Sequence, residues 1–286
     1  MAPDESVNIQ WYPGHMTKTR RQIEADLKLV DAVCEIVDAR IPISSRNPDI
    51  DSICARKPRI ILLNRMDLAD PAATDRWSSY FRSKGMAVVA TDCKSRRGIN
   101  SVVPAVKSLL KEKVERAAAK GMMKSLRVMV VGIPNVGKST LINQISGRKG
   151  AKAENRPGVT RGKQWVNVEG GLLLLDTPGI LWPKFDDPQV GLMLAYTGAV
   201  KENVLDLEDL ASRLMALLWE RYPEALKNRY GIEDPEDTTG YGLLTGPEAG
   251  LPDGPGRDQH RADGKGAAGR IPQRQAGPLY LGGTKL

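Results

Sequence analysis

The 286-residue sequence has little cysteine and no long apolar segment, and each shortage excludes a class of protein. Its three cysteines, Cys34, Cys54 and Cys93, are odd in number and share no CxxC spacing, which argues against a disulfide framework and a zinc site. No run of about 18 apolar residues is present to span a bilayer. The first ten residues, MAPDESVNIQ, carry neither a secretory signal pattern nor an import pattern. We therefore expect a soluble, cytoplasmic protein without a membrane partner.

Positive charge is what the sequence has in excess. Its 42 Lys and Arg residues outnumber 34 Asp and Glu residues, which leaves a net charge of +8. The excess is concentrated, because residues 91–163 hold 17 basic against four acidic residues, whereas residues 181–240 hold six against twelve. A bound nucleotide needs only a few of these charges, so we expect the rest to face RNA and to make its binding sensitive to salt.

Short β-branched or aliphatic runs alternate with longer amphipathic segments, a pattern that predicts an α/β fold with a parallel sheet and flanking helices. The expected strands are Ala32–Val37, Arg59–Leu63, Ala87–Ala90, Leu126–Val131, Gln164–Val168 and Leu172–Leu175. The expected helices are Thr17–Leu29, Pro71–Lys84, Ile99–Ala119, Lys138–Ser146, Pro188–Ala199 and Leu207–Arg221.

The composition divides the chain into three parts. Residues 1–182 form the predicted α/β domain, and residues 183–235 form a small α-helical C-terminal region without a further strand. Residues 236–286 lose apolar periodicity, and eleven Gly and five Pro fall within residues 241–286. Either a disordered tail specific to the lineage or a reading-frame error near Gly240 explains this end, and we favour the second explanation slightly.

A phosphate-binding loop is the strongest chemical signal. Residues 132–140, GIPNVGKST, match GxxxxGK[ST] between an expected strand and an expected helix. The loop N–H groups would wrap a phosphate, Lys138 would reach the β and γ phosphates, and the Ser139 hydroxyl would ligate Mg²⁺. The alternative, a glycine-rich turn with a chance lysine, is disfavoured by the flanking elements. The expected nucleotide contacts here are Asn135, Val136, Gly137, Lys138, Ser139 and Thr140.

Two further segments suit the same triphosphate. Asp176-Thr177-Pro178-Gly179 follows an apolar strand, so Asp176 would support Mg²⁺ through water and the Gly179 N–H would sense the γ-phosphate. In the preceding RPGVT loop, Thr160 would close onto the metal. The alternatives are a plain strand-to-turn DxPG and a threonine that faces water.

The base would be recognised by Asn64-Arg65-Met66-Asp67, which follows the strand RIILL. The Asp67 carboxylate can accept from both N1–H and the 2-amino group of guanine, a donor pair that adenine lacks. Arg65 would lay its stem over the ring, and Asn64 would tie the loop together.

A second base-recognition segment, TDCKS, follows the strand AVVA. The backbone N–H near Cys93 would meet guanine O6, and the Lys94 stem would pack on the other face of the ring. A plain turn is the alternative for each base segment, but together with the phosphate loop they favour GTP over ATP.

These motifs resemble the Ras-like GTPase set, except that the base-recognition motifs precede the phosphate-binding ones. That order is typical of circularly permuted GTPases. With the opening QWYPGHM at residues 10–16, the chain resembles the RbgA (YlqF) family of ribosome biogenesis GTPases over roughly residues 9 to 230. The resemblance implies a circularly permuted P-loop GTPase domain over residues 1–182 and a GTP-hydrolysing factor acting late in large-subunit maturation. GTP or GDP with Mg²⁺ would be its cofactors, and the large ribosomal subunit precursor and its rRNA its partners. We expect a monomer off the ribosome.

Ras-like enzymes orient water with a glutamine after DxxG, where this chain has Ile180 and Leu181, which cannot align water. The resemblance gives His15, in the PGHM signature, a catalytic or water-orienting role. The alternative is that His15 caps the helix beginning near Thr17. We expect the catalytic groups to be His15, Lys138, Thr160 and Gly179.

Asn135 resembles the residue that marks potassium-activated GTPases, in which K⁺ supplies the charge of an arginine finger. The alternative is a loop-stabilising amide. The chain also departs from the family after residue 240, which leaves the helical domain that contacts ribosomal RNA incomplete.

Two other functions compete with the assembly enzyme. A nucleotide-gated binding module with little hydrolysis is supported by the missing glutamine. GTP-driven tRNA modification or metal transport is disfavoured, because the sequence lacks a membrane span and a catalytic cysteine setting.

Overall fold

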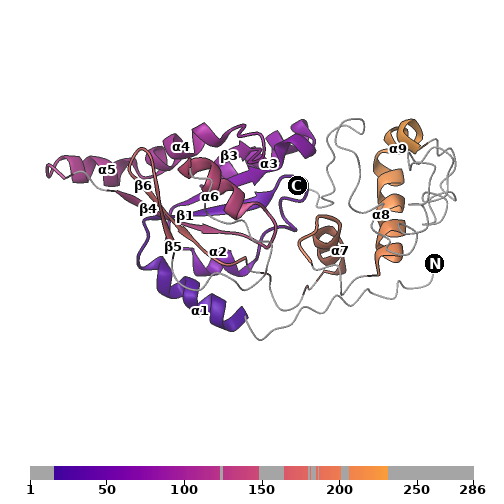
Figure 1. The fold of residues 1–286 in the computed structure, drawn as a ribbon, viewed down its shortest axis with the longest axis horizontal. Helices are drawn as coiled ribbons and strands as arrows, with labels where there is room; N and C mark the ends of the chain where they lie inside the picture. Colours follow the sequence, from indigo (N-terminus) through magenta and orange to yellow (C-terminus); the bar gives the residue numbers. More distant parts are fainter. Residues whose placement is uncertain are drawn as a thin grey trace. The chain divides into compact units, whose positions relative to one another are not determined.

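The computed structural model describes residues 16–122, 125–147, 164–179, 181, 185, 187–200 and 206–230. The described residues as far as Asp187 belong to one compact unit, which contains the sheet, and those from Pro188 onward belong to a second, helical unit (Figure 1). The predicted boundary between residues 182 and 183 remains a prediction. No helix in the described part of the chain is long and apolar enough to cross a bilayer.

The sheet unit confirms the predicted α/β fold. Its strands lie in the order β3-β2-β1-β4-β6-β5, and every neighbouring pair is parallel except β5 with β6. Each strand begins where the sequence predicts and ends within one residue of the prediction. The bounds are β1 (Ala32–Asp38), β2 (Arg59–Asn64), β3 (Ala87–Thr91), β4 (Leu126–Val131), β5 (Gln164–Val168) and β6 (Leu172–Asp176).

The strand order explains how the base and phosphate motifs, although inverted in the sequence, lie along one edge of the sheet. β1 comes first in the chain and pairs with β2 on one side and with β4 on the other. The strands that precede the base segments, β2 and β3, therefore lie on one side of β1, and those that precede the phosphate segments, β4 and β6, lie on the other. Because these five strands are parallel, their carboxyl ends share an edge.

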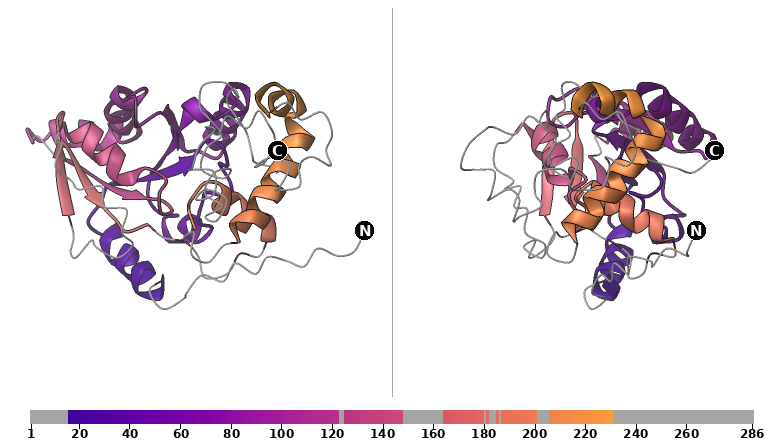
Figure 2. Two further views of the ribbon diagram at one scale, coloured as in Figure 1. Left: turned by 45° about the vertical axis from the view of Figure 1, so that its right-hand side comes forward. Right: turned by 90° about the vertical axis from the view of Figure 1, so that its right-hand side faces the viewer.

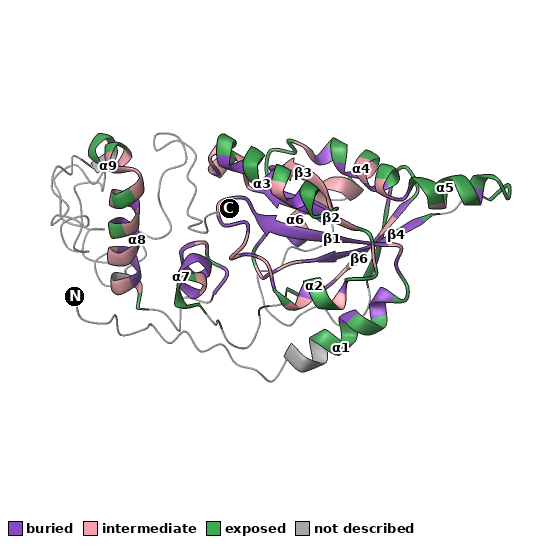
Figure 3. Ribbon diagram, turned by 180° about the vertical axis from the view of Figure 1, so that it is seen from behind, coloured by how far each residue is buried: buried purple, intermediate pink, exposed green. Residues whose placement is uncertain are grey.

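Helices cover both faces of the sheet, since every residue of β1 is buried (Figure 3). One face packs against α1, α2 and α3, whose residues join clusters around Val33 and Val37. In addition, α4 packs on β2 and β3, and α6 packs on β5 and β6. The bounds are α1 (Met16–Leu27), α2 (Asp49–Ile53), α3 (Pro71–Ser83), α4 (Val102–Leu109), α5 (Lys111–Ala118) and α6 (Lys138–Ser146), with short 3₁₀ turns η2 (Met66–Leu68) and η3 (Ile99–Ser101).

The predicted single helix over residues 99–119 is wrong in one respect, because the structure divides it into η3, α4 and α5. The chain leaves helical geometry at Leu110, with φ −107° and ψ 21°, and this residue is buried in the core. Beyond the break, the Lys113 ammonium pairs with the Asp31 carboxylate, which also accepts the Arg127 N–H at 2.9 Å. Through Asp31, these two contacts connect α5 to the beginning of β1 and of β4.

The helical unit holds α7 (Pro188–Tyr196), α8 (Leu207–Arg221) and α9 (Pro223–Tyr230). Within the unit, α8 packs against α7 and α9, and α9 turns sharply away from the end of α8 (Figure 2). α9 lies within the stretch of residues 183–235 that the sequence predicts to be α-helical, and it begins at a proline only two residues beyond α8. The predicted tail over residues 236–286 lies outside the described residues and stays a prediction.

Candidate functional site

The carboxyl edge of the sheet brings four predicted segments together. Residues 64–67, the base loop, begin at the last residue of β2, and residues 91–95, the TDCKS loop, begin at the last residue of β3. Residues 132–140, the P-loop, follow β4, and residues 176–179, the DTPG loop, begin at the last residue of β6.

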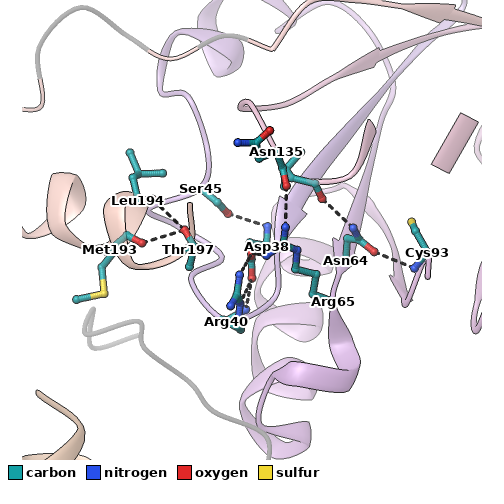
Figure 4. A network of polar contacts seen from close by, with 11 residues as sticks. Asp38, Arg40, Ser45, Asn64, Arg65, Cys93, Asn135, Met193, Leu194 and Thr197 are labelled. Atoms are coloured by element: carbon teal, nitrogen blue, oxygen red, sulfur yellow. Dashed lines mark hydrogen bonds and ion pairs between the residues drawn. The ribbon is translucent and has the colours of Figure 1, made fainter. Parts of the chain in front are cut away.

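Asn64 joins the base loop to the P-loop and to the TDCKS loop (Figure 4). Its Nδ2 donates to the carbonyl oxygen of Val136 at 2.7 Å, and its Oδ1 accepts the Cys93 N–H at 3.1 Å and the Thr91 hydroxyl at 3.4 Å. The packing is close, because a Cβ on Gly137 would lie 2.3 Å from Asn64 Nδ2. Asn64 is 3% exposed, so these bonds are made away from water. It therefore ties three loops together.

The next residue of the base loop, Arg65, contacts the preceding carbonyl of the P-loop, that of Asn135. Arg65 has left-handed backbone angles, φ 63° and ψ 36°, and its Nη2 donates to the carbonyl oxygen of Asn135 at 2.8 Å. Asn135 is also left-handed, with φ 58°. Two consecutive residues thus bind two consecutive P-loop carbonyls across 72 and 70 positions of sequence.

The predicted base-recognition carboxylate, Asp67, is exposed beside Arg65. Partial burial raises the pKa of Asp67 and the charge of Asp92 raises it further, while Arg65 and Arg40 act in the opposite direction. Lys94 is exposed, and its N–H donates to Asp92 Oδ1 at 2.8 Å. Asp67 and Lys94 are therefore both exposed at the edge where the sequence predicts guanine recognition.

The Cys93 N–H does not point freely at a base in this structure, because it donates to Asn64. The expected bond from this region to guanine O6 remains a prediction. If the Cys93 N–H is the donor, it must be shared between Asn64 Oδ1 and O6 or leave Asn64.

Lys138 lies inside the P-loop at the first residue of α6. Its Nζ donates to the carbonyl oxygens of Gly132 at 3.0 Å and Ile133 at 2.6 Å, and the residue is 8% exposed. Burial lowers the pKa of Lys138 to about 8, although the nearby Asp176 carboxylate opposes that shift. Burial likewise raises the pKa of Asp176, and Lys138 lowers it. A buried cation is thus held where phosphate oxygens would compensate its charge.

The DTPG loop lies directly on the P-loop. Thr177 Oγ1 donates to the Val130 carbonyl of β4 at 2.6 Å, which fixes the beginning of the loop. A Cβ on Gly179 would lie 2.8 Å from the Cα and N of Pro134 and 2.9 Å from Lys138 Nζ. The close approach therefore requires glycine, and a displacement of Gly179 would change its contact with Lys138.

The remaining predicted site residues divide into two groups. Ser139 and Thr140 lie in the first turn of α6 and are partly buried, at the helix end that favours anions. His15, Thr160 and Ile180 lie outside the described residues, so their roles remain predictions.

Sequence reasoning did not place Asp38 and Arg40 beside Arg65 of the base loop, where Asp38 pairs with Arg40. Asp38 is the last residue of β1 and pairs in register with Asn64. The available signal was its position, since Asp38 ends an apolar strand as Asn64 and Asp176 do.

Comparisons with known proteins agree with this site. The profile of a family called 50S ribosome-binding GTPase matches residues 127–223. Ribosome biogenesis GTPase A of Priestia megaterium is 52% identical over 234 residues, which is 81% of this chain and 81% of that protein. Mitochondrial ribosome-associated GTPase 1 of Xenopus tropicalis is 34% identical over 236 residues, which is 79% of this chain and 75% of that protein.

A solved GDP-bound structure of YlqF from T. maritima has a similar fold, with a TM-score of 0.52 and 26% identity over 87% of this chain and 96% of that chain. One assignment follows from the phosphate-binding and base loops, from the sheet order, and from the 52% identity to the Priestia megaterium protein, which covers 81% of both chains. This chain is a GTP-binding GTPase and belongs to the ribosome biogenesis GTPase A family, also called RbgA or YlqF.

Proposed function

We propose that this GTPase is a cytoplasmic assembly factor for the large ribosomal subunit, acting late in its maturation on the precursor and its rRNA. The support is the family itself, whose profile is called 50S ribosome-binding GTPase and whose members are called ribosome biogenesis GTPases. The basic excess of residues 91–163 is larger than a nucleotide needs, which favours an RNA partner. Off the ribosome we expect a monomer.

The observation that carries the proposal is the contact of the DTPG loop with the P-loop. Gly179 lies against Pro134 and Lys138, and the chain then runs to the helical unit that begins with α7. In this permuted order, no further strand of the sheet follows the DTPG loop among the residues that the structure describes. We infer that a shift of Gly179 on loss of the γ-phosphate is passed along the chain to those helices and changes affinity for the ribosomal particle.

Residues of the site fit Mg²⁺ beside the phosphates. Asp176 supplies a carboxylate, whose pKa is raised by burial and lowered by the charge of Lys138. Ser139 supplies a hydroxyl in the first turn of α6. Ser139 and Asp176 would hold Mg²⁺ beside the nucleotide, where the ion would neutralise negative charge that develops on the phosphates. Lys138 would hold the β and γ phosphates, and the Gly179 N–H would donate to the γ-phosphate.

The attacking water needs another group, because an apolar residue stands where Ras-like enzymes have glutamine. We propose that His15 orients this water and that Thr160 closes onto Mg²⁺. Single-turnover hydrolysis by His15→Ala, with GTP affinity measured in parallel, tests the first role, and an unchanged chemical rate removes His15 from the mechanism.

A K⁺ ion held by Asn135 would supply positive charge at the developing transition state. Hydrolysis rates in potassium and sodium buffers test this role. A higher rate in potassium supports it, and equal rates contradict it.

Sedimentation with purified large subunits tests the proposed function as a whole. The full-length chain should co-sediment with subunits in a nonhydrolysable GTP analogue and remain in the supernatant in GDP. Rising salt should weaken that binding steeply, because basic side chains replace counterions on RNA. Equal sedimentation in both nucleotides, or binding indifferent to salt, contradicts the proposal.

A second candidate is a nucleotide-gated binding module with little intrinsic hydrolysis, and Ile180 and Leu181 after the DTPG sequence favour it. Turnover on adding large subunits separates the two. Stimulated phosphate release supports the enzyme, whereas nucleotide-dependent binding without release supports the module.

A further inference from the structure

Asp38 is held in a fixed orientation at the end of β1. It is 2% exposed, and its own N–H donates to Ser45 Oγ at 2.9 Å. Its Oδ1 accepts the Arg40 N–H at 3.0 Å and Nε at 2.9 Å, and its Oδ2 accepts Arg40 Nη2 at 2.7 Å. The forked arginine leaves the carboxylate little freedom to rotate.

The same carboxylate faces the arginine of the base loop. Asp38 Oδ2 lies 3.6 Å from Arg65 Nη1, while Arg65 Nη2 donates to the Asn135 carbonyl at 2.8 Å. Arg65 therefore lies between Asp38 and the P-loop (Figure 4). The guanidinium groups of Arg40 and Arg65 both approach Asp38, and its negative charge offsets their mutual repulsion. Burial lowers the pKa of Arg65, Asp38 opposes that shift, and Arg40 adds to it.

We propose that Asp38 is a positioning residue for nucleotide binding, which acts through Arg65 to hold the base loop at a fixed distance from the P-loop. A guanine nucleotide spans both loops, because its ring would lie on the Arg65 stem while its phosphates occupy the P-loop. Fixing the spacing before binding lowers the ordering cost of binding. Arg40 contributes by holding Asp38.

The geometry also accounts for arginine at position 65, where the motif of Ras-like GTPases has lysine. A guanidinium presents separate nitrogens in a rigid fork, so one can face Asp38 while another donates to Asn135. An ammonium group is a single point of charge on a flexible stem and holds this arrangement less firmly.

A double-mutant cycle tests the proposal in the full-length chain. Asp38→Asn keeps the shape but removes the charge, and Arg65→Met keeps the stem but removes the guanidinium. Each single variant should bind a fluorescent GDP analogue about tenfold more weakly, the loss expected for one charged hydrogen bond. If Asp38 acts through Arg65, the double variant should also be about tenfold weaker, because the two effects are not additive. An additive, hundredfold loss in the double variant overturns the proposal.

Glu35→Gln is the matched control. Glu35 lies three residues earlier in β1, is 1% exposed, and bonds in a fork with Arg46 at 2.9 and 3.0 Å. Among the described residues this pair extends to Asp51 of α2 and makes no hydrogen bond to the P-loop. Glu35→Gln should lower the melting temperature as Asp38→Asn does but leave GDP affinity unchanged. An equal loss of GDP affinity in Glu35→Gln makes the effect a general loss of stability and overturns the proposal.

Arg40→Lys keeps the test decisive if Asp38→Asn does not fold. Lysine retains a charge beside Asp38 but cannot form the fork, so Arg40→Lys should lower GDP affinity about threefold. Added to Arg65→Met, the same change should not lower GDP affinity below that of Arg65→Met alone. Unchanged affinity in Arg40→Lys, or the same threefold loss in both backgrounds, contradicts the proposed route through Arg65.

Discussion

The side-chain amide of Asn64 donates to the carbonyl oxygen of Val136 at 2.7 Å and joins two loops that are 72 positions apart in the sequence. The base loop follows β2 and the P-loop follows β4, and these strands lie on opposite sides of β1, so the bond requires both strands to be paired with β1. Nucleotide affinity and folding of the sheet are therefore linked at one buried side chain.

Replacing Asn64 with alanine should impair both properties. The change removes the donor to Val136 and the acceptor of the Cys93 N–H, and it leaves buried polar groups unpaired. We expect a loss of about 2 kcal/mol in the free energy of unfolding and at least about a tenfold loss of GDP affinity. Urea unfolding and titration with a fluorescent GDP analogue measure the two effects.

Asn47→Ala is the control for this variant. Asn47 is 6% exposed, and its Oδ1 accepts the Asp49 N–H at 2.9 Å within its own turn. We expect a loss of about 1 kcal/mol in stability with unchanged GDP affinity. Normal GDP binding by Asn64→Ala would contradict the role given to Asn64.

A methyl group at position 179 should impair hydrolysis. The Cβ of Gly179→Ala would lie 2.8 Å from the Pro134 backbone and 2.9 Å from Lys138 Nζ, so the DTPG loop must move away from the P-loop. We expect single-turnover GTP hydrolysis to fall at least about tenfold, because the barrier rises when aligned groups are displaced.

Gly85→Ala shows whether a strained glycine replacement elsewhere has the same effect. Gly85 has φ +78° and nothing within 4 Å of an added Cβ. Its replacement should cost about 1 kcal/mol of stability through backbone strain alone and leave hydrolysis unchanged. Similar rates for Gly179→Ala and the parent chain would show that the close contact is not needed for turnover.

Proton uptake should accompany GDP binding in mildly alkaline solution. Burial lowers the pKa of Lys138 to about 8, so more than half of these side chains are neutral at about pH 8.5 before nucleotide binds. The phosphates favour the charged form and raise this pKa, so binding draws a proton from the buffer at that pH. Near pH 6.5 the lysine is already charged before GDP binds, so it takes up no proton on binding.

Calorimetry in two buffers of different ionisation enthalpy measures this uptake. Lys138→Met, which cannot accept the proton, should lack the difference between buffers. The interpretation fails if the parent chain and Lys138→Met take up equal numbers of protons.

Changing the carboxylate of the base loop should change base preference. Asp67→Asn loses the acceptor pair for guanine N1–H and 2-amino groups, so GDP affinity should fall at least about a hundredfold. The new amide can donate to O2 of xanthine, so affinity for xanthosine diphosphate should rise. Competition against the fluorescent GDP analogue measures both changes.

Asp75→Asn is the matched carboxylate-to-amide control, because Asp75 is exposed on α3 outside the four loops. It should keep the parent preference for guanine. Retention of that preference by Asp67→Asn would remove Asp67 from base recognition.

Most strands were predictable because they are near-continuous apolar runs, whereas the edge strand β5 shows an alternation of exposed and buried residues over Trp165–Val168. α2, with five residues, is too short to show a helical period, and the helical pattern over residues 99–119 continues across Leu110, which hides the break between α4 and α5. In both cases tertiary contacts, and not local propensity, determine the structure.

The site loops were predictable from motifs that pair a strand end with a phosphate or base contact. Asn64 was expected to tie its loop, but its partner Val136 could not be identified, because the contact depends on β1 lying between β2 and β4. The ion pair of Asp38 with Arg65 was missed for the same reason. His15 and Thr160 stay predictions.

Phosphate release by the full-length chain, from GTP and from ATP, with and without purified large ribosomal subunits, tests the central claim most directly. We predict release from GTP and not from ATP, with at least about a tenfold stimulation by the subunits, the scale on which a partner completes a GTPase site. Equal release from the two nucleotides, or a GTP rate that subunits leave unchanged, would contradict the account.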